Sequence, residues 1–203
     1  MGRHTPAMSD TELAVYLEEH LATELQWLLR AATEWHVQDT LKLGIEGYEV
    51  QVFAMDSAFL HARTLLEFLT KCTSDNYYGC DAFGISRLES QRYGGAWEEH
   101  LHAALMHAQD RSETTMLLGF DGQSRKRLDQ MPVDFAKEVV RLWREFAVAL
   151  GDHDRPTISR LQGVAEKSLE DAIVNADRVA NSKVTTAHAD GKPISKIRWQ
   201  GQA

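Results

Sequence analysis

The sequence contains two cysteines and four prolines among 203 residues, and it has no long uninterrupted apolar run. Cys72 and Cys80 are too few for a disulfide framework, and their spacing is not typical of a zinc site. No stretch is long and apolar enough to cross a bilayer, and the first residues have no apolar segment like that of a signal peptide. We therefore expect a cytoplasmic protein without a membrane segment. The scarcity of proline and the long stretches of 3.6-residue periodicity favour an all-α fold.

Strongly basic regions are also lacking. The formal net charge is -8. Because binding to duplex nucleic acid depends on clustered cations, this pattern argues against a general duplex-binding surface. It leaves a local RNA-cutting site open. The hydrophobic content of 43% is too high for a disordered chain, and the length suits one domain with a real core.

The stretch 55–69, MDSAFLHARTLLEFL, organises the predicted fold, because it has the pattern of a long buried helix. This helix is expected to run from about Gly44 to about Ser74. One apolar stripe consists of Tyr48, Val52, Met55, Phe59, Ala62, Leu66 and Leu69, and a second beside it of Ala54, Ala58, His61, Leu65, Phe68 and Cys72. A narrow polar arc holds Glu49, Asp56, Arg63, Glu67 and Ser74. A helix with so broad an apolar face is expected to be central in its domain.

Four further helices complete the prediction. Their expected ranges are 9–38, 96–115, 132–150 and 154–181, with a short helical piece at 82–90 and a loop at 118–131. Ser9 or Asp10 can cap the first helix, with Glu12 in its first turn. Pro132 suits the first turn of another helix, which Gly151 then ends.

The predicted fold class is all-α, an up-and-down bundle of four long helices plus a shorter C-terminal helix. It forms a single domain over 9–181, with flexible termini at 1–8 and 182–203. The sequence contains no internal repeat that would indicate a solenoid.

His61 and Arg63 are the polar residues of interest on the central helix. His61 lies near the middle of the apolar arc and Arg63 points roughly the opposite way, so the two cannot line one small site on an undistorted helix. His61 is either a core histidine satisfied by a hydrogen bond or a binding residue that faces the interior. Arg63 and Glu67 stand at i,i+4, where a surface ion pair is the simplest interpretation.

The third long helix carries a second polar group. His100, His107 and Arg111 fall within about 40° of one another on the helical wheel. Because His107 and Arg111 stand at i,i+4, they can reach one ligand together, which makes them the candidate catalytic pair. His61, Arg63 and His100 are candidate binding residues. Alternatively, His107 hydrogen-bonds a neighbouring helix and Arg111 pairs with an acid.

Metal and nucleophile chemistry find little support in the sequence. A carboxylate–histidine metal site needs inward-facing Glu-x-x-His pairs on several helices, and the pair of Glu99 and His102 lies on the exposed side. A site formed by His61, His100 and His107 is geometrically conceivable. There is no Gly-x-Ser-x-Gly elbow, phosphate loop or dinucleotide fingerprint. We predict no metal and no cofactor.

The run 59–69, FLHARTLLEFL, resembles a segment of a family of uncharacterised bacterial helical proteins. In that family a His-Ala-Arg-x-Leu-x-x-Phe helix is followed by a short Asp-containing connection and later by a His-x-x-x-Arg helix. The matching pieces here are His61-Ala62-Arg63 with Leu65 and Phe68, then Asp81-Ala82-Phe83, then His107 to Arg111, and finally Trp143 with Phe146. The resemblance spans roughly residues 45–150. It implies a helical fold rather than an activity, because the family has no established activity.

A looser resemblance is to the HEPN ribonucleases, which are helical bundles of toxin–antitoxin and phage-defence systems. Their signature places an Arg four to six residues from a His, usually on a late helix at a dimer interface. Arg30 and His36 have this spacing on the first helix, whereas His107 and Arg111 have the reverse order.

Two functions of different class follow. The first is a non-enzymatic helical module that binds a protein partner or forms a homodimer through one face of the bundle. The second, implied by the HEPN resemblance, is a metal-independent ribonuclease, with RNA as its partner. There His107 would act as general acid or base and Arg111 would stabilise charge on the phosphate, with His61 or Arg63 in support. The broad apolar faces and the absence of a strong catalytic motif favour the first.

Overall fold

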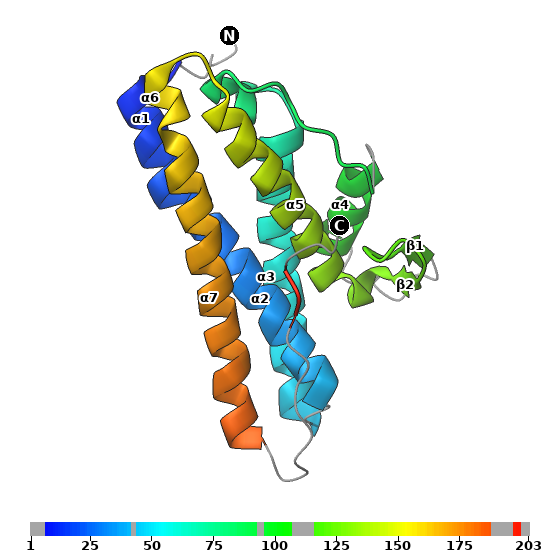
Figure 1. Ribbon diagram of the computed structural model, residues 1–203. Helices are drawn as coiled ribbons and strands as arrows, with labels where there is room; N and C mark the ends of the chain where they lie inside the picture. The colour runs from blue at the N-terminus through cyan, green and yellow to red at the C-terminus, as the bar shows by residue number, and fades with distance from the viewer. Residues whose placement is uncertain (1–6, 42–43, 93–95, 107–115, 188–196, 200–203) are drawn as a thin grey trace.

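The computed structural model describes residues 7–41, 44–92, 96–106, 116–187 and 197–199 and arranges them as an all-α bundle, as predicted (Figure 1). The helices are α1 (Asp10–Val15), the π-helical segment η1 (Tyr16–Leu21), α2 (Ala22–Leu41), α3 (Gly44–Thr70), α4 (Trp97–Met106), α5 (Pro132–Gly151), α6 (Pro156–Ser159) and α7 (Leu161–Ala187). Two short 3₁₀ helices, η2 (Cys80–Phe83) and η5 (Leu128–Gln130), and a two-stranded sheet complete the described elements.

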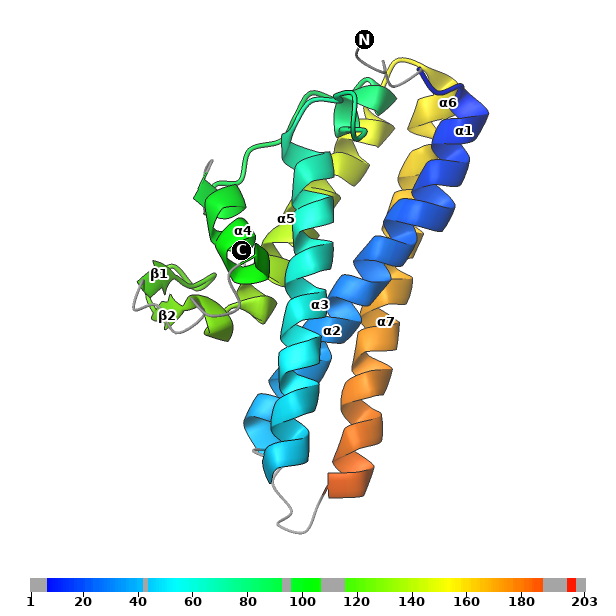
Figure 2. The ribbon, with the colours of Figure 1, turned by 180° about the vertical axis from the view of Figure 1, so that it is seen from behind.

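The long helices run in both directions, with α3 and α5 parallel to each other and antiparallel to α2 and α7 (Figures 1 and 2). Helix α2 leads away from the N-terminal end, α3 returns, and the connection through α4 brings the chain back to the start of α5. Helix α2 packs against α3 and α7, and α5 packs against the same two neighbours. Four helices therefore enclose one core, which confirms the predicted helical bundle. The predicted up-and-down order is corrected in one respect, because the long connection through α4 makes α5 parallel to α3 (Figure 1).

The first helix is built on a four-residue leucine repeat. Leu13, Leu17, Leu21 and Leu25 are all buried. In an α-helix of 3.6 residues per turn each four-residue step drifts by about 40°, so an unbroken α-helix would turn some of these leucines away from the core. The wider π turn corrects this drift, because the Ala22 N–H donates to the Leu17 carbonyl five residues back. The segment η1 thereby keeps the four leucines on one face of a continuous rod.

Two helix ends agree with the sequence signals. Helix α1 begins with a capping box, in which the Glu12 N–H donates to Ser9 Oγ at 3.3 Å and the Ser9 N–H donates to the Glu12 carboxylate at 2.8 Å. The hydrogen bond from the Ser9 backbone also lowers the pKa of the Glu12 carboxyl. Helix α5 begins at Pro132 and ends at Gly151, as predicted to within a residue.

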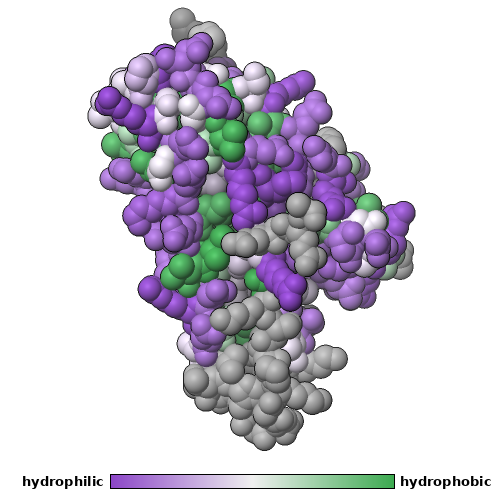
Figure 3. All heavy atoms as spheres, viewed as in Figure 1, coloured by the Kyte–Doolittle hydropathy of each residue, from purple (hydrophilic) through white to green (hydrophobic). Residues whose placement is uncertain are grey.

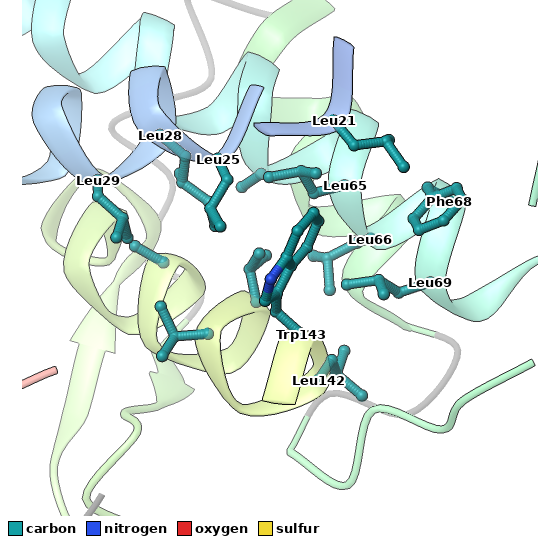
Figure 4. Packing of buried hydrophobic residues seen from close by; sticks show 14 of the residues in the cluster. Leu21, Leu25, Leu28, Leu29, Leu65, Leu66, Phe68, Leu69, Leu142 and Trp143 are labelled. Atoms are coloured by element: carbon teal, nitrogen blue, oxygen red, sulfur yellow. The ribbon is translucent and has the colours of Figure 1, made fainter. Parts of the chain in front are cut away.

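The middle of the core is aromatic. Phe68, Phe83 and Phe146 form a mutual edge-to-face triad with ring centroids 5.9, 5.2 and 5.5 Å apart. Trp143 is fully buried, and its ring points from α5 toward Leu65 and the neighbouring leucines (Figure 4). These contacts join α3, η2 and α5. They hold α3, the helix that the sequence predicted to be central, in the core.

The prediction that the C-terminal helix is shorter than the other long helices is wrong. Helix α7 has 27 residues, as many as α3, and it continues to Ala187 rather than ending near 181. Its buried positions are Leu161, Ala165, Leu169, Ala172, Ala176 and Ala180. Alanine gives a weak amphipathic signal but a high helix propensity, and its small side chain lets α7 approach α2 closely.

The connection between α3 and α5 differs most from the prediction. The helical piece expected at 82–90 is limited to η2, and the chain then runs beside the end of α3, where the Leu88 N–H donates to the Leu69 carbonyl at 2.9 Å. The loop expected at 118–131 contains an antiparallel hairpin of β1 (Met116–Leu118) and β2 (Arg125–Arg127), followed by η5. Of the helix expected at 96–115, the described residues form α4.

Part of the C-terminal tail packs on the bundle (red in Figure 1). Trp199 is buried, and its carbonyl accepts a hydrogen bond from Arg144 Nη2 of α5 at 3.3 Å. The prediction of a flexible terminus did not anticipate this contact. A single tryptophan in a stretch without periodicity carries no pattern that would indicate burial. Among the described helices, none is long and apolar enough to span a membrane.

The two cysteines differ sharply in environment, which gives a first prediction. Cys72 is exposed, whereas Cys80 is buried with its Sγ donating to the Leu69 carbonyl at 3.4 Å. Burial raises the pKa of the Cys80 thiol to about 11, so almost no thiolate forms at pH 8. We expect iodoacetamide to alkylate Cys72 in the native protein and Cys80 only after unfolding, as measured by peptide mass spectrometry. Equal labelling of both thiols in the native state would contradict the burial of Cys80.

Candidate functional site

His61 is held by a partner on the neighbouring helix. Its Nδ1 lies 2.7 Å from Glu24 Oε2 of α2, and the two side chains are 17% and 31% exposed. The indole of Trp27 stacks on the imidazole with ring centroids 6.4 Å apart and planes 18° from parallel. His61 therefore lies at the edge of the core, satisfied by a carboxylate, and not in the middle of an apolar interior as the wheel suggested.

Arg63 behaves as the simplest interpretation predicted. Its Nε lies 3.3 Å from Glu67 Oε1, one helical turn along α3, and both side chains are partly exposed. Glu67 also pairs with Lys71, whose Nζ lies 2.7 Å from Glu98 of α4. These pairs fasten α4 to the end of α3, and they leave Arg63 away from the His61 side of the helix.

The polar residues of the third predicted helix are only partly described. His100 of α4 is half-buried, and this burial lowers its pKa, which favours the neutral imidazole. His107 and Arg111 lie outside the described residues, so their role as a catalytic pair stays a prediction. Within the described part of the chain, no group of three or more His, Cys, Asp and Glu side chains could hold a metal ion.

A different feature stands out on the outer face of α2 and α3, and we call it the α2–α3 surface. It consists of Trp27, Val50, Phe53 and Leu60, which are 47%, 40%, 73% and 52% exposed. Seen from behind, α3 lies on the near side of the molecule, with no described element in front of it (Figure 2). By contrast, the opposite face carries apolar side chains in small separate groups among hydrophilic ones (Figure 3).

Helical geometry aligns the members of this surface. Phe53 and Leu60 are seven residues apart, about two turns, so they lie nearly on one line along α3. Ser57 lies between them, and Val50 continues the line at its other end. Trp27 adds a flat ring at the level of His61, because the two rings stack. The Glu24 carboxylate thus orients His61, and His61 supports the exposed indole.

The sequence contained a signal for this surface that the two predicted apolar stripes of the central helix did not include. Phe53 and Leu60 belong to neither apolar stripe of α3 and fall beside the polar arc of Glu49, Asp56 and Arg63. Large apolar side chains beside a polar arc are unusual on a helix that already buries a broad face. Trp27 could not be assigned to the same surface, because nothing local to α2 shows that it neighbours α3.

Comparison with known proteins adds no relative from which a role could be transferred. The chain matches no protein-family model, no curated protein and no solved structure.

Proposed function

We propose that this protein is a self-associating helical module and that the α2–α3 surface binds a second copy of the chain. The observation that carries the proposal is Phe53, which is 73% exposed and aligned with Leu60. Leaving a phenylalanine so exposed forgoes the stabilisation of about 1.5–3 kcal/mol that burial of its side chain gives. An apolar line on a rigid helix supplies such burial when it meets a copy of itself.

An antiparallel pairing of the two α3 helices makes the surface complementary to itself. With the two-fold axis at the level of Ser57, Phe53 of each copy lies opposite Leu60 of the other. Trp27 lies at the level of His61, so it faces the stretch that contains Val50 and Phe53 of the second copy. The aromatic side chains then form the centre of the interface, where anchors contribute most to affinity.

Charges on one flank favour the same orientation. Glu49 and Arg63 are 14 residues apart and therefore about 40° apart around α3, on the same side of the apolar line. In a two-fold antiparallel pair, each flank faces the same flank of the other copy. Arg63 of one copy then lies beside Glu49 of the other, twice, which adds an attraction that a parallel pairing lacks.

The proposal is tested by the mass of the protein in solution. We expect the parent chain to be a dimer at high micromolar concentration by light scattering. Phe53→Asp or Leu60→Asp is expected to weaken association by about thirtyfold or more, because a central anchor contributes about 2 kcal/mol or more. Val148→Asp is the matched control, since Val148 is 56% exposed on α5, away from this surface. A parent chain that remains monomeric would refute self-association.

Charge reversal tests the orientation separately. Glu49→Arg and Arg63→Glu should each weaken the dimer, and the double variant should recover it because the reciprocal pairs are restored with exchanged signs. Dimerisation that responds to Phe53→Asp but not to these reversals would retain the surface and reject the antiparallel orientation.

A further inference from the structure

A polar pocket lies on another part of the bundle, between the C-terminal half of α2, the first turns of α5, the strand β2 and the C-terminal residues 197–198. Its volume is about 620 Å³, within the range of pockets that hold small molecules. The residues that matter for its chemistry are Trp35, His36, Lys126, Asp134, Lys137 and Arg198. We infer that this pocket, here called the α2–α5 pocket, binds a small organic phosphate monoester.

The cations of the pocket come from three separate segments of an acidic chain. Lys126 belongs to β2, Lys137 to α5 and Arg198 to the C-terminal tail, while the chain as a whole carries a formal net charge of -8. Lys126 lies in the basic run Arg125-Lys126-Arg127, but no single run of the sequence contains all three cations. Folding alone brings the three positive groups to the lining of one cavity, which concentrates positive charge there.

The acids of the pocket cancel only part of this charge. Asp134 is buried and fully engaged, because its carboxylate accepts hydrogen bonds from the Phe120 N–H at 2.5 Å and from Lys126 Nζ at 2.7 Å. Asp134 therefore neutralises Lys126 and fixes it to the wall. Among the described residues, Lys137 and Arg198 have no carboxylate partner. These two positive charges face one further acid, Asp39, whose carboxylate accepts a hydrogen bond from Gln51 Nε2 at 3.3 Å.

The chemistry of the remaining cations suits a phosphate. An Arg offers paired N–H donors that match phosphate oxygens, and a Lys offers a compact point charge. Both can approach one ligand from different walls, since Lys137 lies on α5 and Arg198 on the tail. The pocket also contains Val133 and Asp134, in the first turn of α5, so the positive end of this 20-residue helix dipole adds to the attraction.

The other wall favours an organic rather than an inorganic phosphate. Trp35, Val133 and Ile197 give apolar surface to the same cavity, which is far larger than an inorganic phosphate needs. A planar or apolar group attached to the phosphate would cover this surface. The position of Arg198 is set by its neighbour Trp199, which is buried and accepts from Arg144 Nη2. The tail therefore supplies both a wall and a cation.

Isothermal titration calorimetry with the full chain tests the inference, with adenosine 5′-monophosphate as probe. We expect binding of this nucleotide, with adenosine at least about tenfold weaker because it lacks the charged group. Lys137→Gln and Arg198→Gln should each weaken nucleotide binding by about tenfold or more. Lys167→Gln, which removes the same charge from an exposed site on α7, should leave binding unchanged. Lys137→Arg should recover most of the affinity, since it restores the charge.

Three results would overturn the inference. The first is no binding of adenosine 5′-monophosphate by the folded parent chain at millimolar concentration. The second is binding that Lys137→Gln and Arg198→Gln weaken no more than Lys167→Gln does. The third is equal affinity for adenosine. A 5′-phosphorylated oligonucleotide, titrated beside the nucleotide, separates the two sources of the same group: tighter binding of the oligonucleotide would assign the phosphate to the end of a nucleic acid strand.

Discussion

Replacing Trp143 with alanine is expected to lower the free energy of unfolding by about 3–5 kcal/mol. Trp143 is fully buried in α5, and its Nε1–H donates to the Ala165 carbonyl of α7 at 2.9 Å. Its ring also packs against Phe146, with centroids 5.8 Å apart. Truncation removes the largest fully buried side chain of the core and leaves a cavity where α5 meets α3 and α7.

Urea unfolding followed by circular dichroism measures this loss, and thermal unfolding should show a decrease in Tm of roughly 6–20 °C. Trp143→Phe keeps most of the volume and removes the indole donor, so it should cost less than the alanine variant. Val148→Ala on the same helix should change stability by no more than about 0.5 kcal/mol, because Val148 is exposed. Similar losses for Trp143→Ala and Val148→Ala would show that α5 does not form the centre of the core.

The sequence predicted the long helices because their apolar residues recur with the helical period, as in α3 and α5. The hairpin could not be predicted in this way. Its second strand is Arg125-Lys126-Arg127, which has no apolar alternation, and it is fixed by contacts from elsewhere. Asp134 of α5 binds both the Phe120 N–H and Lys126. A strand held by a tertiary contact cannot be found from its own residues.

In the sites, too, only those features that depend on residues close in sequence could be predicted. His61 could be singled out from the wheel, but its partner Glu24 lies 37 positions earlier, and only packing of α2 on α3 brings the two within 2.7 Å. Phe53 and Leu60 could have been placed on one outward line from helical geometry alone. The cations of the α2–α5 pocket are too far apart in sequence for any spacing rule to join them.

Replacing Glu138 with alanine is the second change with a large expected effect, a loss of about 3 kcal/mol in the free energy of unfolding. Glu138 is fully buried in α5. Its carboxylate accepts hydrogen bonds from Ser90 Oγ at 2.7 Å and from Arg141 Nε and Nη2 at 3.1 and 2.9 Å. Arg141 Nη2 also donates to the Glu89 carbonyl at 3.1 Å. This network ties residues 89–90 of the connection between η2 and α4 to the bundle.

Removing the carboxylate leaves the Ser90 hydroxyl and the Arg141 guanidinium without their buried acceptor. In the parent protein the hydrogen bonds to Glu138 raise the pKa of Arg141. Without them the guanidinium still stays charged at every accessible pH, because arginine is not deprotonated in proteins, so it cannot escape the cost by losing a proton. The loss should lie at the lower end of the range for broken buried pairs, since Arg141 is 22% exposed and keeps its contact with Glu145.

Urea unfolding and limited trypsin digestion distinguish this network from an ordinary surface pair. Glu145→Ala removes the exposed partner of the same Arg141 and should cost no more than about 1 kcal/mol. Glu138→Gln should fall between the two variants, because its amide oxygen still accepts from Ser90. In Glu138→Ala alone, trypsin should cleave faster after the exposed Arg87, since the chain beside it has lost its anchor. Equal stability and equal cleavage in the two alanine variants would mean that α5 holds this connection through apolar packing, so the buried carboxylate would be neither its anchor nor a major source of stability.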